Sequence, residues 1–212
     1  MAKSKATAES DRQRYSPQER KQLILEAARR VLLVNPDASL EDIADEAGIT
    51  RQLVSRYFPG GGITPIAEAL FDEYEHHFAR VFVDFPSEGV ETTEEVDEAI
   101  AKTIGHFLDW AEEDGQPWLF GGEGAAIATQ LAARRADLRT NLAMVMLHFA
   151  RKIVNENDLT RIALQAEGRA TDEVVWQMLT GKASREDCER ILNARFRAMV
   201  SEVLPSLDGR SD

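Results

Sequence analysis

This sequence has little of what secreted proteins, membrane proteins and most enzymes need. Its single cysteine, Cys188, cannot form an intramolecular disulfide, which is typical of a reducing compartment. It has no apolar run long enough to span a membrane and no apolar signal region within residues 1–30, so we expect a cytoplasmic protein without a membrane partner. It also lacks a glycine-rich phosphate loop and a nucleophile elbow, so we expect no enzyme and no cofactor.

Basic residues are scarce relative to acidic ones, and the shortage is uneven. The chain has 25 Lys and Arg against 37 Asp and Glu, a net charge of -12. Residues 1–56 hold ten basic and nine acidic residues, so all of the excess acid lies after them. Because DNA repels an acidic body, this distribution would direct only the N-terminal part toward DNA. Acidic surfaces are also common in soluble proteins, which explains the charge of the body equally well.

The most informative segment is Ser39 to Phe58, SLEDIADEAGITRQLVSRYF. Ser39 and Thr50 each stand where a helix N-cap is expected, and Gly48 can supply the positive φ that ends the first helix. Apolar residues recur at helical spacing between these caps. The segment therefore predicts a helix-turn-helix with a tight turn at Gly48-Ile49.

The second helix of this pair presents polar side chains and no acid to solvent. Those side chains are Arg51, Gln52, Ser55, Arg56 and Tyr57. An α-helix fits the major groove, where Arg and Gln make bidentate contacts with base edges and hydroxyls reach phosphates. The pattern therefore predicts DNA binding, although a solvated helix in an ordinary bundle would share it.

The rest of the chain predicts further helices and no strand. We expect an all-α fold of about nine helices with three parts: a flexible basic arm (1–14), a DNA-binding domain (15–78), and a helical effector-binding and dimerisation domain (79–212). Besides the pair above, the expected helices cover residues 17–33, 64–85, 94–113, 136–155, 158–180 and 184–204, with a less regular segment over 118–135. Leu204-Pro205 is expected to end the last helix.

On these residues, the chain resembles the tetracycline-repressor (TetR) family of transcriptional regulators. The resemblance rests on about sixty residues: a long first helix, the SLEDIADEAGIT hairpin, a short second helix ending in Tyr57-Phe58, and a long fourth helix. It implies a homodimer that binds a palindromic double-stranded DNA operator. We expect repression of transcription rather than activation. A small-molecule effector in the body would change the spacing of the two heads.

The resemblance also implies individual roles. Ser39 would touch phosphate, and Thr50, Arg51, Gln52, Ser55 and Tyr57 would face DNA. Family members often carry Tyr in place of Ser55 and His in place of Tyr57. A phosphate-gripping Lys after the loop is replaced here by Gly61, Gly62 and Ile63. Backbone N–H groups at the start of the fourth helix are our candidate substitute for that Lys.

The last two helices carry apolar stripes that correspond to the family's four-helix dimer interface, although the same stripes would fit a monomer core. The expected interface residues are Ile162, Ala166, Ala170, Val174, Met178, Ile191, Phe196 and Met199. Gly168 and Ala170 would allow close helix crossing there.

Candidate residues for an effector pocket lie between Tyr74 and Phe149 and combine apolar side chains with a few polar anchors. They are Phe78, His106, Phe107, Trp110, Trp118, Phe120, Glu123, Met144, Met146 and His148. Aromatic residues at helical spacing more often form core than pocket, so these residues are core candidates as well.

Two other classes of function are open to such a sequence. Glu73 and His76 match half of a di-iron bundle motif, but the second half is missing, so we expect no metal. A helical adaptor that binds protein, and uses its N-terminal part only for folding, would show no salt-sensitive DNA affinity.

Overall fold

A computed structural model describes residues 15–81, 92–121, 129, 131–150 and 154–207. Every regular element within these ranges is a helix, which confirms the predicted all-α fold. The predicted arm at residues 1–14, the expected helix end near Phe85, and Glu123 lie outside the described residues. None of the described helices is both long enough and apolar enough to cross a bilayer.

The N-terminal head consists of three helices, α1 (Pro17–Val34), α2 (Leu40–Glu46) and α3 (Arg51–Tyr57). α1 packs on α2, and α2 packs on α3. Their apolar faces meet in one core cluster, as the helical spacing predicts. Its buried members in the head include Ile24, Ala27, Ala28, Leu32, Leu40, Ile43, Ala44, Val54 and Phe58.

Each helix of the head begins at the residue that the sequence predicts. Ser16 forms a capping box: its Oγ accepts from the N–H of Glu19 at 3.2 Å, and the Glu19 carboxylate accepts from the N–H of Ser16 at 2.6 Å. Ser39 and Asp42 form the same reciprocal pair at the start of α2. Thr50 Oγ1 accepts from the N–H of Leu53 at 3.3 Å and starts α3. These caps fix the directions of the short helices.

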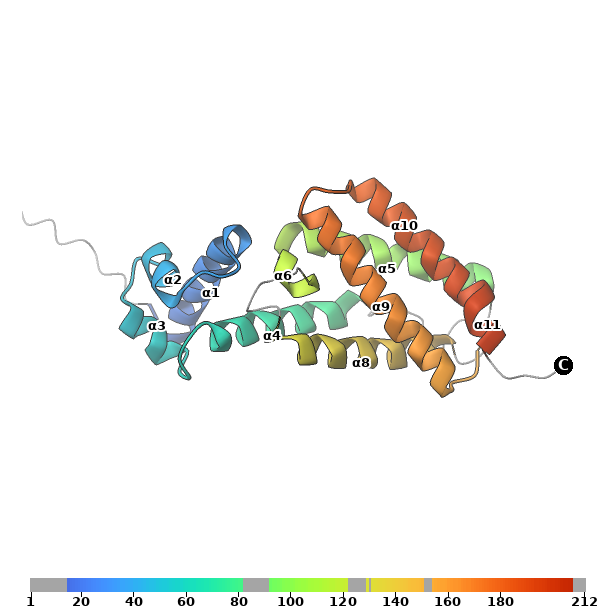
Figure 1. The fold of residues 1–212 in the computed structure, drawn as a ribbon, viewed down its shortest axis with the longest axis horizontal. Coiled ribbons are helices and arrows are strands. Elements are labelled where there is room, and N and C mark those ends of the chain that lie inside the picture. The colour runs from blue at the N-terminus through green and yellow to red at the C-terminus, as the bar shows by residue number, and fades with distance from the viewer. Residues whose placement is uncertain (1–14, 82–91, 122–128, 130, 151–153, 208–212) are drawn as a thin grey trace, which may run out of the picture.

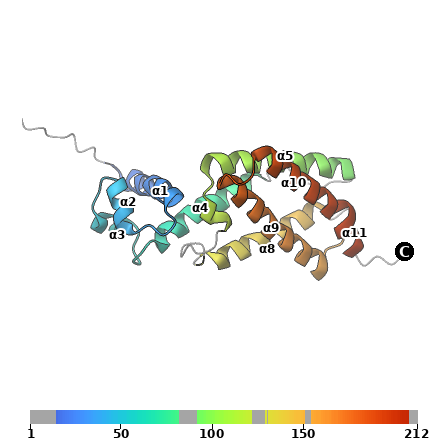
Figure 2. The same cartoon turned by 45° about the horizontal axis from the view of Figure 1, so that its top comes forward.

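α4 (Thr64–Val81) joins the head to the rest of the molecule. It packs on α1 at one end and on α5 at the other. Figures 1 and 2 show an elongated molecule, with the head at one end, the last described helical turns at the other, and α4 leading from the head into the body. Arg29 of α1 forms an ion pair with Glu73 of α4, so the head and α4 are linked by charge as well as by apolar packing.

The body is built from α5 (Thr93–Asp114), the short α6 (Pro117–Phe120), α8 (Ala132–Ala150), α9 (Asp158–Leu179) and α10 (Arg185–Ala198). α9 lies at its centre, because α5, α6, α8 and α10 all contact it. The core cluster of the head continues along α4 into α5, α6, α9 and α10. A second, smaller cluster lies where α8, α9 and the C-terminal turns meet.

The C-terminal end differs from the sequence prediction. The last helix does not end at Leu204-Pro205, because a π-helical turn (Met199–Val203) leads into α11 (Leu204–Leu207). In this wider turn, the N–H of Leu204 donates to the carbonyl of Met199. Pro205 then falls in the first turn of α11, directly after this wider turn. α8 also begins earlier than predicted, at residue 132 instead of 136.

Candidate functional site

The first candidate site is the outer face of α3. Arg51, Gln52 and Arg56 are exposed, whereas Ser55 and Tyr57 are half-buried. Val54 is fully buried and Phe58 nearly so, and these two anchors fix which side of the helix turns outward. No acidic residue occurs in α3, so the exposed face can approach a polyanion without a repulsive carboxylate of its own.

The hydroxyls at the two caps differ in what they can offer a phosphate. The Thr50 hydroxyl accepts the Leu53 N–H, and its own proton can still be donated outward. The Ser39 hydroxyl donates to the Asp42 carboxylate at 2.7 Å, and the same carboxylate accepts from the Ser39 N–H. These hydrogen bonds lower the pKa of Asp42, which therefore keeps its negative charge beside Ser39. Thr50 is thus the better placed of the two predicted phosphate contacts.

The loop that precedes α4 has an unusual backbone. Gly60, Gly61 and Gly62 all have positive φ, which residues with a side chain rarely adopt. At the start of α4, Pro65 has no N–H, and the N–H groups of Ile66 and Ala67 both donate to the Ile63 carbonyl at 3.0 Å. Because these backbone N–H groups are already hydrogen-bonded, they are poor candidates to bind phosphate in place of the lysine that is missing here.

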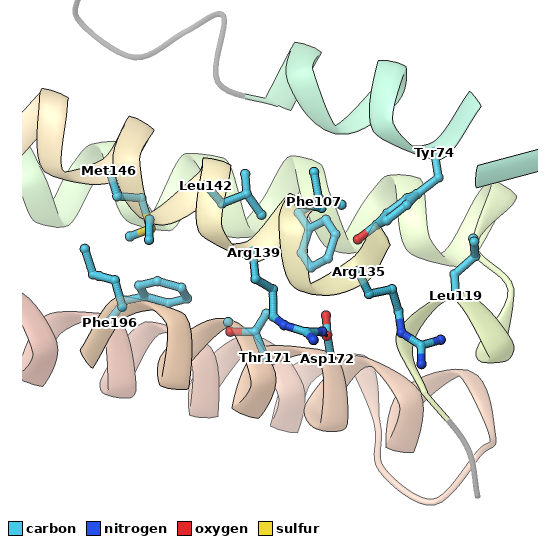
Figure 3. A pocket seen from close by; sticks show the side chains of 14 residues that line it. Tyr74, Phe107, Leu119, Arg135, Arg139, Leu142, Met146, Thr171, Asp172 and Phe196 are labelled. Carbon is cyan, nitrogen blue, oxygen red and sulfur yellow. The ribbon is translucent and has the colours of Figure 1, made fainter. Parts of the chain in front are cut away.

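The second candidate site is a cavity of about 70 Å³ in the body. It lies among α4, α5, α8, α9 and α10 and reaches α6, with side chains of each of these helices in its wall (Figure 3). Its lining residues are Tyr74, Phe107, Leu119, Arg135, Leu138, Arg139, Leu142, Ala143, Met146, Leu164, Gly168, Thr171, Asp172 and Phe196. Leu142, Met146 and Phe196 lie toward one end of it, and Tyr74 and Arg135 toward the other (Figure 3).

Three charged residues from the described part of the chain lie in the wall of this cavity. Arg139 Nη1 donates to Asp172 Oδ2 at 2.6 Å, and both side chains are only 17% exposed. Arg135 Nη1 donates to the Trp118 carbonyl at 3.0 Å. Burial raises the pKa of Asp172 to about 6, against the opposing effect of Arg139. Burial also lowers the pKa of Arg135 and raises that of Tyr74 well above its ordinary value. Burial thus dominates the pKa shifts of all three groups, so this cluster is poorly hydrated.

Gly168 lies against this cluster within its own chain. A β-carbon there would lie 3.2 Å from Cγ of Arg139 and 3.3 Å from its Cδ. The sequence predicts that Gly168 permits close crossing between two protomers. In the structure it permits close approach of α8 to α9, and the position of Arg139 depends on it.

Few of the predicted pocket residues line the cavity. Among those whose side chains the structure describes, Phe107 and Met146 alone do so. Trp118 and Phe120 are buried in the core, because their helix turns inward after Pro117. Trp110 stacks on Tyr74 with ring centroids 5.0 Å apart and faces a smaller cleft beside Arg29 and Gln116. His106, Met144 and His148 are exposed instead, because they lie on the outer faces of α5 and α8. The side chain of Phe78 and all of Glu123 fall outside the described residues.

The predicted dimer residues divide into two groups. Ile162 is 60% exposed and Ile191 is 42% exposed, with exposed Ala166 and half-buried Ala170 and Val174 on the same pair of helices. Met178 and Met199 are buried within the chain, and Phe196 lines the cavity. These last three face inward because α10 packs on both α5 and α9. They therefore have little surface left for a second protomer.

Sequence reasoning missed Leu159, Arg135, Arg139 and Asp172. Leu159 is 57% exposed and stands one turn before Ile162 on α9, a spacing that could have revealed it. Arg135 and Arg139 are also one turn apart on α8. Leu138 lies between them in the sequence, and Leu142 follows three residues after Arg139. Two cations on an otherwise apolar helix face were a usable signal. Asp172, the partner of Arg139, could not be identified from the sequence because it belongs to another helix.

The residues of the half di-iron motif serve a structural contact. Glu73 forms an ion pair with Arg29. His76 lies one turn before Arg80, and Nη2 of Arg80 lies 3.2 Å from Nε2 of His76. Among the described residues, no group of three or more His, Cys, Asp or Glu side chains is arranged to hold a metal ion.

Comparison with known proteins finds similar structures, but searches by sequence find no match. No protein-family model and no curated protein matches this chain. A TetR-family transcriptional regulator from Streptomyces coelicolor is 21% identical over 91% of this chain and 88% of its own, with a TM-score of 0.65. The fatty acid degradation regulator FadR from Bacillus halodurans is 17% identical, covering 90% of this chain and 98% of its own, with a TM-score of 0.61. A TetR transcriptional regulator from Rhodococcus sp. RHA1 is 15% identical, covering 89% of this chain and 100% of its own, with a TM-score of 0.56.

Proposed function

We propose, from the premise that this chain has the fold of the TetR-family transcriptional regulators, that it is a sequence-specific DNA-binding repressor. A small molecule bound in its body would lower its affinity for a palindromic operator. The proposal assigns no catalytic step to the chain. Residues 15–78 would bind DNA, and the remainder would bind the effector and a second protomer.

The observation that carries this proposal is the orientation of α3. Buried Val54 and Phe58 turn Arg51, Gln52 and Arg56 outward on a head in which every helix start is capped. Such a helix can enter the major groove, where Arg reads guanine and Gln reads adenine by paired hydrogen bonds. Thr50 would donate its hydroxyl proton to a phosphate at the start of the same helix.

A homodimer would supply the second head that a palindromic operator requires. Exposed apolar residues on α9 and α10 support this part of the proposal, because large apolar side chains that recur along one face are unusual on a monomer. They are Leu159 and Ile162 on α9 and Ile191 on α10. Together with Ala166 they would form the centre of a four-helix interface between two copies.

The proposal is tested by selecting genomic fragments that the purified protein retains and measuring affinity for them by fluorescence anisotropy. We expect one recurring palindromic sequence, bound with an affinity that falls steeply as salt rises, because each phosphate contact releases counterions. Retention of fragments without a shared sequence, or an affinity insensitive to salt, would contradict the proposal and favour a protein-binding adaptor.

A further inference from the structure

The corner between α5 and α6 buries polar atoms that the chain leaves without a hydrogen bond. Trp110 Nε1, a donor, and Gln116 Oε1, an acceptor, are both shielded from solvent, and neither has a hydrogen-bond partner in the described part of the chain. Gln116 as a whole is only 7% exposed. A buried polar group without a partner raises the free energy of the folded chain, so a molecule that supplies both missing partners would be bound favourably.

The backbone fixes the position of Gln116. Gly115 follows α5 with its N–H donating to the Ala111 carbonyl at 3.0 Å, and a β-carbon at Gly115 would collide with that same oxygen. Gln116 comes next, and its carbonyl accepts from the N–H of Leu119 at 2.9 Å. This tight corner holds Gln116 beside the cleft that Trp110 also lines.

That cleft, here named the junction cleft, lies where the head meets the body. Besides Trp110 and Gln116, its lining includes Arg29 of α1 and both Glu73 and His77 of α4. Figure 1 shows α6 at the end of the body that is nearest the head. An occupant of the junction cleft would therefore touch helices of both parts.

The size of the junction cleft restricts the polar group that can enter it. Its volume is about 20 Å³, and a single water molecule needs roughly 10–15 Å³. A hydroxyl fits this space, and it is the smallest group that can both donate and accept a hydrogen bond. Leu70, Leu119 and Tyr74 also line the cleft and offer apolar surface to the rest of a ligand.

We propose that the junction cleft binds a small neutral alcohol with a short apolar chain. Its hydroxyl would donate to Oε1 of Gln116 and accept from Nε1 of Trp110, and its carbon chain would lie against Leu70 and Leu119. The Gln116 side chain has several rotatable bonds, so a small rotation brings its amide oxygen to the hydroxyl. An occupant would stabilise the present arrangement of head and body. This site is separate from the larger cavity and does not rest on the function proposed above.

The test is a titration of the ¹⁵N-labelled full chain, without DNA, followed through the indole N–H resonances of its three tryptophans. Butan-1-ol both donates and accepts, its isomer 1-methoxypropane only accepts, and the butylammonium ion only donates. We expect butan-1-ol to bind about threefold to tenfold more tightly than either of the others, because each of those leaves one buried atom without a partner. Equal or tighter binding of the ether or the ammonium ion would overturn the proposal.

The indole resonances also report where the alcohol binds. The resonance that is lost in Trp110→Phe identifies Trp110, and Trp176 of α9, with Lys182 over its ring, is the internal reference. We expect butan-1-ol to shift the Trp110 resonance saturably and to leave that of Trp176 nearly unchanged. A Trp110 resonance that does not respond, or an equal shift of Trp176, would overturn the assignment to this cleft.

Two variants test the role of Gln116. Gln116→Leu removes the buried acceptor, and we expect the affinity for butan-1-ol to fall about threefold or more. The matched control is Gln22→Leu, an exposed glutamine on α1 outside the lining, which should bind as the parent does. If Gln116→Leu does not fold, Gln116→Met, which keeps the length of the side chain, serves instead. Parental affinity in the folded variant would contradict the proposal.

Discussion

The two arginines of α3 lie close in sequence to a larger number of acidic residues. α2 carries Glu41, Asp42, Asp45 and Glu46, all of them exposed, within the same hairpin. Glu46 is paired with Arg30 at 2.6 Å, but the others are directed to solvent or to their own helix cap. With so few cations near a docked phosphate backbone, each contact from α3 should matter more than in a strongly basic head.

We therefore expect Arg51→Ala to weaken operator binding by about ten- to a hundredfold and to relax preference at one base pair. The physical reason is the loss of a bidentate contact with a base edge. Fluorescence anisotropy with the selected operator and its single-base variants measures both effects. Arg190→Ala is the matched control, since Arg190 is 74% exposed on α10, far from the head in sequence, and should leave affinity unchanged. Parental affinity and selectivity in Arg51→Ala would contradict the docking of α3.

Asp172 should make the stability of the protein depend on pH in an unusual direction. Burial raises its pKa to about 6, so between its ordinary pKa and about 6 the folded chain binds more protons at this site than the unfolded chain. The contribution of Asp172 to stability therefore falls as pH rises through this window and is constant above it. The usual acidic residue, with a lowered pKa, behaves in the opposite way.

The measurement is urea unfolding of the parent and of Asp172→Asn at several pH values. The free energy of unfolding of the variant minus that of the parent should rise with pH by at most about 1.4 kcal/mol per unit within the window, and level off above it. A difference that does not vary with pH would mean that Asp172 is not perturbed in solution.

At the level of elements, the turn between α2 and α3 determines how the hairpin closes. The N–H of Gly48 donates to the Asp45 carbonyl at 3.1 Å, and the N–H of Ile49 donates to the Ala44 carbonyl at 3.0 Å. These two bonds form a Schellman motif, which requires the positive φ of 63° that Gly48 adopts. The angle at which α3 leaves the turn, and so its reach toward DNA, follows from this geometry.

Gly48→Ala should lower the free energy of unfolding by about 1–2 kcal/mol, because an alanine pays the steric cost of the left-handed conformation. No atom lies within 4 Å of the added β-carbon, so the effect would be one of backbone conformation alone. Gly105→Ala is the matched control: it lies inside α5, also with open space around it, and should be neutral or stabilising by up to about 1 kcal/mol. Urea unfolding measures both, and equal effects from the two changes would contradict this account of the turn.

At the scale of the whole molecule, one core cluster runs from the head through α4 into the body. This continuity, with the Arg29–Glu73 pair beside it, gives a mechanical route by which a change around Tyr74 can reach the head. The acidic surface outside the head would keep the body away from DNA while the heads bind.

The dimer proposal predicts that Ile162→Glu converts the protein to monomers, since a charge on each of two facing helices opposes association. Sedimentation velocity should show the mass halve, and operator affinity should fall with it. Val34→Glu is the matched control, because Val34 is 85% exposed at the end of α1 and outside the proposed interface. A parent that sediments as a monomer, or an Ile162→Glu variant that stays dimeric, would contradict the interface.

The sequence by itself determined the features that depend on neighbouring residues. Helix starts at Ser16, Ser39, Thr50 and Ser184 were predictable, because a cap needs only a short polar side chain next to its own helix. The start of α5 was predictable to within one residue, since the sequence offers both Thr92 and Thr93 as caps and the structure uses Thr92. The outward face of α3 was predictable for the same reason, since Val54 and Phe58 define the inward side through local periodicity.

Only the tertiary structure decided which side chains from different helices meet. It brought Arg139 of α8 to Asp172 of α9, turned Phe196 toward the cavity, and left Leu159 and Ile162 exposed. Apolar residues at helical spacing look alike in a sequence whether they face the core, a cavity or a second protomer. The difference lies in the crossing of α8, α9 and α10, and contacts between residues distant in the chain fix that crossing.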